Sequence, residues 1–338
     1  MAFRRDVGVD LGTSTVLVFV KGKGIVLNEP SVVAFDKSSK RILAVGEEAK
    51  SMIGRTPGDI VAVRPMKEGV IADYEITEKM LRYFLRKVLG RFSPVRPNIM
   101  VCIPSGATDV EKRAVLEAAM RVGAKRAFLI EEPMAAAIGA GVNISEARGS
   151  MVVDIGGGTT DIAVISLGGI VVSESLKVAG NNMDEAIFKY VKNKFNLIIG
   201  EQTAEIIKKE IGSAIGDEDK EMDLRGRDLM TGLPKSIKIT SKMVSEAISG
   251  AVRRIIDGVK MVLERTPAEL SADVIDRGIV MTGGGSLLHG LDRLISEATG
   301  IATYVADDPL TCVVKGTGMA LDVIDSLHGG ILSYSHKR

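Results

Sequence analysis

An internal repeat constrains this chain more than any other feature. The segment VGVDLGTSTVLVFV (Val7–Val20) returns as MVVDIGGGTTDIAVI (Met151–Ile165), with Asp10 and Asp154 at the same place in each copy. Each copy has an apolar run, a turn rich in glycine and hydroxyl residues, and a second β-branched run, which predicts a β-hairpin. Because 338 residues are enough for two ordinary domains, we expect a duplicated domain whose hairpins face each other across a cleft.

Helical and strand patterns alternate after the first hairpin, as in an α/β domain. Apolar residues recur at helical spacing over Ile76–Leu89, and the apolar run Asn98–Pro104 predicts a buried strand. Thr108 and Glu111 fit a capping box at the start of a helix that runs to about residue 122. The segment Ala127–Ile130 predicts the next strand.

The second half repeats this order and carries its own insertion. The acidic stretch Gly216–Asp223 is interpreted as a surface loop with no function of its own. We therefore predict a first domain at residues 1–145 with an insertion at about 31–75, and a second at 146–338 with an insertion at about 182–250. The elements expected in the second half are strands at 170–178 and 278–285 and helices from about 183, at 203–211 and at 241–263.

Composition excludes several classes of protein. Lys and Arg (44) nearly balance Asp and Glu (43), so no net field favours nucleic acid as a partner. No stretch has the roughly 20 apolar residues that span a bilayer, and the N-terminus lacks a secretory signal pattern. Cys102 and Cys312 lie far apart in apolar surroundings, which indicates reduced core thiols. We expect a cytoplasmic protein.

The glycine-rich turns predict a phosphate site. Glycine lets backbone N–H groups approach an anion closely, and nearby hydroxyl groups add donors. One such turn is as well explained by a plain hairpin, but two facing turns and a third glycine run favour a ligand. The candidates are Gly12, Thr13, Ser14, Gly156, Gly157, Gly158, Thr159, Thr160, Gly283, Gly284, Gly285 and Ser286.

An aspartate precedes each of the two hairpin turns at the end of an apolar strand. A carboxylate buried there without a partner is unfavourable, so we expect a cation nearby. Mg²⁺ prefers oxygen ligands and retains waters, and Asp10 and Asp154 are predicted to hold it largely through water. Two aspartates that merely cap their turns are the alternative.

Four motifs, DLGTST, IEEPMAAAIG, DIGGGTTD and TGGGSLLHGLD, together resemble the superfamily of actin, DnaK-type chaperones and sugar kinases. Longer segments, among them RPMKEGVIADY and ERTPAELSADVIDRGIVMTGGG, resemble the bacterial actin homologues of the MreB and Mbl family over nearly the whole chain. The resemblance implies an α/β actin-like ATPase fold. Its two ribonuclease-H-like domains have mixed sheets flanked by helices and hold ATP or ADP in the interdomain cleft.

The resemblance also implies a catalytic residue. Glu132 matches the family position that orients the water attacking the γ-phosphate, and its neighbour Glu131 is the competing candidate. A carboxylate that only stabilises a helix N-terminus would explain either residue without catalysis.

Glu205, Lys208 and Lys209 share one helical face and match the family segment that contacts ribose and adenine. A solvated helix face is the commoner explanation of this spacing. Gly180 is included in the adenosine site by the same reasoning as the glycine run at 283–286, whose backbone can approach a ligand closely.

The chain departs from the commonest family pattern at two places. Asp161 stands where many MreB-type proteins have Glu, and Asn181 and Asn182 replace the usual acidic pair, which leaves Asp184 as the remaining acid. Either change could alter nucleotide affinity or hydrolysis.

The segment Arg86–Pro97 places three apolar residues, Leu89, Phe92 and Val95, among basic ones. An apolar tip flanked by bases suits an anionic membrane surface, and the matching family loop inserts into the bilayer. A loop that folds Phe92 back into the core is the alternative.

These resemblances imply a filament protein that polymerises head to tail, hydrolyses ATP slowly and lies at the inner face of the cell membrane. They also imply partners among membrane-embedded cell-wall elongation proteins. A small-molecule kinase is the alternative enzyme, although no acceptor-binding insertion with a catalytic base is evident. A chaperone would need a substrate-binding domain that we do not find in the sequence.

Overall fold

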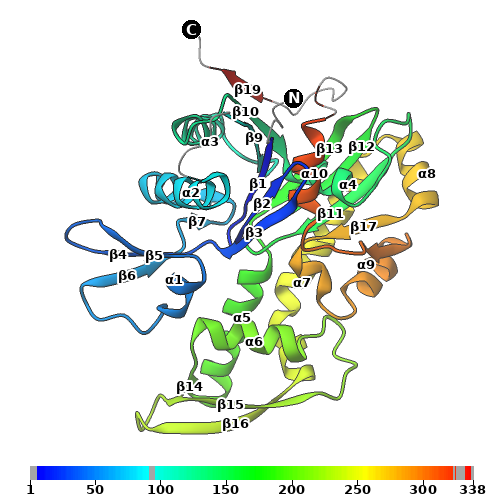
Figure 1. The fold of residues 1–338 in the computed structure, drawn as a ribbon. Coiled ribbons are helices and arrows are strands. Elements are labelled where there is room, and N and C mark those ends of the chain that lie inside the picture. Colours follow the sequence, from blue (N-terminus) through cyan, green and yellow to red (C-terminus); the bar gives the residue numbers. More distant parts are fainter. Residues whose placement is uncertain (1–5, 91–95, 323, 325–331, 336–338) are drawn as a thin grey trace.

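Two β-sheets form the centre of the protein in a computed structural model that describes residues 6–90, 96–322, 324 and 332–335 (Figure 1). The first sheet has the strand order β19-β10-β9-β1-β2-β3, and the second has the order β13-β12-β11-β17-β18. The strands of the first sheet are β1 (Val7–Leu11), β2 (Thr15–Val20), β3 (Gly24–Pro30), β9 (Asn98–Ile103), β10 (Arg126–Glu131) and β19 (Leu332–Ser335). Those of the second are β11 (Ser150–Ile155), β12 (Thr160–Ser166), β13 (Gly169–Leu176), β17 (Ile279–Thr282) and β18 (Thr303–Val305).

The two sheets repeat one topology. Each sheet contains an antiparallel meander, β1-β2-β3 or β11-β12-β13. The first strand of each meander also pairs in parallel with a further strand, β1 with β9 and β11 with β17. The repeat extends to a β-bulge, because Val26 on β3 and Val171 on β13 are each left without a partner in the register. The predicted pair of hairpins is confirmed, while the domain boundaries stay a prediction.

Helices cover the outer faces of both sheets. Helices α2 (Tyr74–Leu89) and α3 (Asp109–Arg121) pack on the first sheet, and the capping box of Thr108 and Glu111 is present as predicted. The second sheet is covered by α5 (Gly180–Phe195), α7 (Ser241–Arg265), α8 (Ala268–Arg277) and α9 (Leu291–Thr299). In the part of the chain that is described, no helix is long and apolar enough to cross a membrane.

Each half also carries a small outer sheet, that of the first half at the left of Figure 1 and that of the second half at its lower end. The first half has β4 (Val33–Asp36), β5 (Ile42–Val45), α1 (Glu47–Ser51) and β6 (Ile60–Val63), followed by β7 (Met66–Lys67) and β8 (Val70–Ile71). The second half has β14 (Leu197–Ile198), α6 (Glu201–Ile211), β15 (Glu221–Asp228) and β16 (Pro234–Thr240). The insertions predicted at about 31–75 and 182–250 span these elements, and their status as insertions stays a prediction.

Three sequence predictions were wrong in detail. The acidic stretch is not all loop, because Glu221 to Asp223 begin β15, where Lys238 pairs with Glu221 across the hairpin. Only one residue of β15, Leu224, is buried, so the strand lacks the apolar alternation that identifies strands. The helix expected from residue 183 begins at Gly180, and β17 ends at Thr282 rather than at residue 285.

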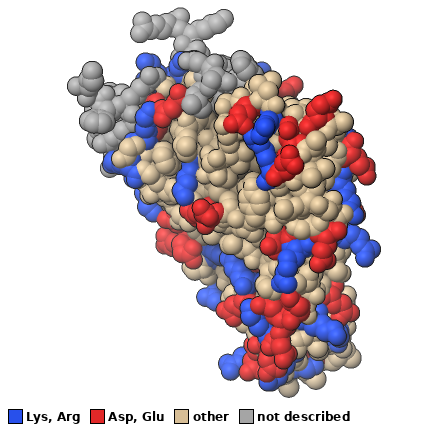
Figure 2. All heavy atoms as spheres, turned by 90° about the vertical axis from the view of Figure 1, so that its right-hand side faces the viewer, with Lys and Arg blue, Asp and Glu red and all other residues tan. Residues whose placement is uncertain are grey.

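Charged side chains are interspersed over the surface. Figure 2 shows acidic and basic groups intermixed on the visible face, most densely at its lower end. Several form ion pairs, such as Lys235 with Asp228 and Lys189 with Glu185. This face carries no broad patch of one sign, in keeping with the net charge of +1.

Helices α4 (Glu132–Gly139) and α10 (Cys312–Ala320) join the two halves. A cluster of buried apolar residues from both sheets surrounds them. The helix backbones touch: a Cβ added to Gly316 would lie 1.8 Å from the carbonyl oxygen of Ala135, and one added to Gly139 would lie 1.8 Å from that of Cys312. Glycine is therefore required on both helices for this approach.

We expect Gly316→Ala to lower the free energy of unfolding by about 1–3 kcal/mol or more, because the new methyl group must push α4 and α10 apart. Gly250→Ala is the matched control, since Gly250 lies in α7 and a Cβ there would meet nothing within 4 Å. That change should leave stability equal or raise it by up to about 1 kcal/mol. Chemical unfolding measures both, and equal stability of the two variants would contradict the packing described.

Candidate functional site

The two glycine turns meet between the halves of the protein. The N–H of Gly12 donates to the carbonyl of Thr15 at 3.0 Å, and that of Gly156 donates to the carbonyl of Thr159 at 2.9 Å. A Cβ added to Gly157 would lie 1.9 Å from the hydroxyl oxygen of Ser14. Only glycine permits such close contact, and the predicted facing arrangement of the turns is confirmed.

The N-terminus of α5 packs on the second turn and carries the two asparagines that depart from the family pattern. The N–H of Asn181 donates to the carbonyl of Gly157 at 2.8 Å, and its side-chain oxygen accepts from the Ser14 hydroxyl at 3.2 Å. The side-chain oxygen of Asn182 accepts from the N–H of Ala179 at 2.9 Å and so caps the helix. Asn181 therefore links the two halves, a role that sequence reasoning missed.

The third glycine run packs against the end of β11. It continues into a short 3₁₀ helix (Gly284–Leu287). Gly283 has a φ of 77°, and a Cβ there would lie 2.4 Å from the carbonyl oxygen of Ile155. The run therefore lies beside the second turn, as a shared ligand site would require.

Some of the predicted hydroxyl donors already have acceptors within the protein. The hydroxyl of Thr160 donates to the carbonyl of Val178 at 2.7 Å, and that of Ser286 donates to the carbonyl of Gly283 at 2.6 Å. The hydroxyls of these two residues are therefore engaged within the protein, and the N–H of Ser286 also donates to the carbonyl of Gly283, at 3.3 Å.

Four carboxyl groups gather beside the turns: Asp10, Glu132, Asp154 and Asp161. Burial raises the pKa of Asp10 to about 6 and that of Asp154 to about 7. Burial, reinforced by Asp161, Asp154 and Asp10, raises the pKa of Glu132 well above its usual range. Burial also raises the pKa of Asp161, whose oxygen accepts from the Ser105 N–H of the other half at 3.0 Å. This cluster favours either bound protons or a nearby cation.

The two strand-end aspartates fit a hydrated divalent cation. Among the described residues, neither Asp10 nor Asp154 forms an ion pair, and no group of three or more His, Cys, Asp or Glu side chains is placed to hold a metal directly. Two carboxylates at the junction of the two glycine turns supply the oxygen donors that Mg²⁺ accepts while keeping its waters.

The predicted adenosine residues do not all act together. Lys209 pairs with Glu205 at 2.6 Å, whereas Lys208 pairs with Asp184 at 2.8 Å and donates to the carbonyl of Gly180 at 2.9 Å. Lys208 thus contacts both Gly180 and Asp184, the acidic residue that remains where Asn181 and Asn182 replace the usual acidic pair.

Glu205 also reaches the other half of the protein. Lys50 on α1 lies 3.3 Å from the Glu205 carboxylate, and the side-chain amide of Gln202 donates to the carbonyl of Lys50 at 2.8 Å. Burial alone would raise the pKa of Glu205, but Lys209 and Lys50 outweigh it and lower the pKa to about 2. Two helices from different halves are therefore joined beside the candidate site, which the spacing of residues along the chain could not reveal.

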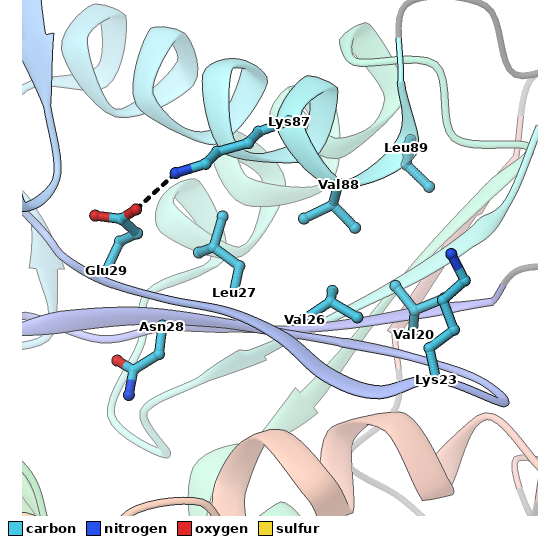
Figure 3. Close-up of a pocket in the computed structure, with 9 residues that line it drawn as sticks. All are labelled: Val20, Lys23, Val26, Leu27, Asn28, Glu29, Lys87, Val88 and Leu89. Carbon is cyan, nitrogen blue, oxygen red and sulfur yellow. Dashed lines mark hydrogen bonds and ion pairs between the residues drawn. The ribbon is translucent and has the colours of Figure 1, made fainter.

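A separate pocket of about 300 Å³ lies between β3 and the end of α2 (Figure 3). None of its lining residues belongs to the glycine turns. Leu89, a predicted membrane residue, lines this pocket and is half-buried, while the ion pair of 2.7 Å between Lys87 and Glu29 lies at the opposite end of the pocket (Figure 3). The other two predicted membrane residues, Phe92 and Val95, lie outside the described residues.

The raised pKa of Asp154 predicts a pH-dependent stability. Its carboxyl group has an ordinary pKa of 3.8 when unfolded and a pKa of about 7 when folded, so the folded chain binds more protons between these values. The free energy of unfolding contributed by this group therefore falls as pH rises through that window. Without ligands at pH 8, we expect Asp154→Asn to be more stable than the unmodified chain by on the order of a few kcal/mol.

Urea unfolding at a series of pH values tests this expectation. The advantage of Asp154→Asn should shrink steadily as pH falls below about 7 and vanish near pH 4. An advantage that is constant from pH 5 to pH 8 would show that burial does not shift this pKa.

Comparison with known proteins agrees with this geometry. A family model described as MreB/Mbl protein matches residues 4–329. The chain is 55% identical over 328 residues to the cell shape-determining protein Mbl of Bacillus subtilis, covering 96% of this chain and 98% of the relative. It is 54% identical over 336 residues to the cell shape-determining protein MreB of Escherichia coli, covering 98% and 96%.

Solved structures agree with the fold. MreB5 of Spiroplasma citri bound to ADP superposes with a TM-score of 0.91 at 40% identity, covering 95% of this chain and 97% of that one. A double helical filament of MamK, at 24% identity and a TM-score of 0.81 over 94% and 99% of the two chains, shares the fold. With actin-like sheets, facing glycine turns and relatives of this similarity over nearly its full length, the chain belongs to the MreB/Mbl family.

Proposed function

We propose that this protein binds ATP and ADP with Mg²⁺ between its halves and assembles head to tail into filaments that organise cell-wall elongation and cell shape. One observation carries the proposal: two touching glycine turns lie beside four carboxyl groups whose pKa values are raised by burial. Support comes from relatives named as cell shape-determining proteins and from MreB5 structures bound to ADP and AMPPNP.

The proposed roles follow the positions of the residues. Backbone N–H groups of the two turns, residues 12–14 and 156–160, bind the phosphates, except those of Gly12 and Gly156, which donate within their own turns. Asp10 and Asp154 hold the waters of Mg²⁺, which would neutralise charge on the phosphates. Gly180, Glu205, Lys208, Lys209 and residues 283–286 surround the adenosine.

Glu132 is favoured over Glu131 as the residue that positions the attacking water. Glu132 is buried beside three aspartates, and a carboxyl group whose pKa is raised can accept and hold a proton near neutral pH. Glu131 precedes α4 and is more exposed. Hydrolysis is expected to be slow and coupled to filament ageing.

We further propose that the protein lies at the inner face of the cell membrane, with membrane-embedded cell-wall elongation proteins as partners. The basic and apolar segment at residues 86–97 supports membrane contact. Head-to-tail contacts that do not close into a ring generate open filaments. A small-molecule kinase would instead turn over ATP faster when an acceptor is added.

Electron microscopy on anionic lipid with Mg²⁺ and ATP, ADP or no nucleotide tests polymerisation. We expect nucleotide-dependent filaments, and Glu132→Ala should form them with ATP while releasing phosphate at least about 10²-fold more slowly, because the water loses its proton acceptor. Absence of polymer in every condition, with ATP turnover that rises on adding a small acceptor, would favour the kinase.

Cosedimentation with anionic vesicles tests the membrane proposal. Phe92→Ser should weaken binding several-fold, because one large apolar side chain is removed from the bilayer contact. Leu167→Ser is the control, since Leu167 is 57% exposed at a turn of the other half. Vesicle binding that is unchanged in Phe92→Ser, or equally weakened in both variants, would contradict the proposal.

A further inference from the structure

The two strand-end aspartates are held in the same way by different chemical groups. Cys102 follows Val101, which pairs with Val9 in the parallel ladder of β1 and β9, so Cys102 lies beside Asp10. In the second sheet, Thr282 pairs with Asp154 across β11 and β17. Cys102 and Thr282 therefore occupy equivalent positions in the duplicated fold.

Each of these residues donates to its aspartate. The thiol of Cys102 lies 3.4 Å from Oδ1 of Asp10, and the hydroxyl of Thr282 lies 2.7 Å from Oδ1 of Asp154. Cys102 is 2% exposed and Thr282 is fully buried, so neither side chain has solvent as an alternative partner. Each contact engages Oδ1 of its carboxylate, and among the described residues no hydrogen bond to the other oxygen is seen.

The two donors differ in strength. A thiol is a weak donor compared with a hydroxyl, so Asp10 is held less firmly than Asp154. Residues that orient a metal-holding carboxylate usually matter almost as much as the carboxylate itself. The other thiol does not share this role, because Cys312 donates to the carbonyl of Asp308 within its own segment.

We propose that Cys102 is a positioning residue for the cation site: its thiol orients the Asp10 carboxylate toward the hydrated Mg²⁺, as the Thr282 hydroxyl orients Asp154. This inference rests on the proposed binding of nucleotide and Mg²⁺. It assigns the thiol a function beyond filling the core, and it makes the first half the weaker side of the cation site.

The surroundings of Cys102 allow a matched pair of substitutions. A cavity of about 20 Å³ borders Cys102, together with residues such as Leu11, Ile103 and Val115. The extra atom of threonine or valine therefore has room. These two side chains share one shape, and only threonine has the hydroxyl that could replace the thiol as a donor.

Calorimetric titration of ADP, with Mg²⁺ or with EDTA, tests the proposal on purified protein. We expect Cys102→Val to reduce the enhancement of ADP affinity by Mg²⁺ roughly tenfold, whereas Cys102→Thr should equal or exceed the unmodified chain. Thr282→Val should reduce the enhancement at least as much as Cys102→Val. ADP affinity in EDTA should stay unchanged in all three variants.

Equal Mg²⁺ enhancement in Cys102→Val and Cys102→Thr would overturn the inference. A loss that is just as large in EDTA would also overturn it, because it would report a distorted site rather than a misdirected carboxylate. Unfolding midpoints of the two Cys102 variants identify any difference in folding. If the unmodified chain fails to bind ADP in either condition, the proposed function fails as well, whereas the other two outcomes leave it intact.

Discussion

The burial of carboxyl groups beside two touching glycine turns is the constraint on which the structure depends. Asp10 and Asp154 are the next-to-last residues of two central strands, β1 and β11. Burial raises the pKa of both groups, so each is less stable as an anion than in water. A cation would compensate such groups, and the proposed Mg²⁺ would do so while it also neutralised the charge of bound phosphates.

Close backbone approach makes this site compact. Gly157 lies against Ser14, and on the other side of the junction Gly316 lies against the backbone of α4. Larger residues at either place would separate the halves and with them the carboxyl groups. The glycines therefore allow the two halves to meet, and in the proposed function the same turns also contact the phosphates.

Duplication explains both the symmetry of the site and its exceptions. The sheets repeat their strand order, their parallel neighbours and their bulged residues, Val26 and Val171. The two copies differ in the group that contacts the aspartate: a thiol lies beside Asp10 and a hydroxyl lies beside Asp154. Asn181 adds a contact between the copies, because its side chain joins the second turn to Ser14 of the first.

The sequence by itself determined the hairpins, the capping box before α3 and the strands beside them, because apolar periodicity and short-range capping are local properties. It failed at β15, a charged strand that is held by its pairing with β16, across which Lys238 also forms an exposed ion pair with Glu221. Only the tertiary structure decided that Lys50 reaches Glu205, that Ser105 donates to Asp161 and that Cys102 faces Asp10. Each of these contacts joins residues more than 50 positions apart, and packing of whole sheets, not local spacing, brings them together.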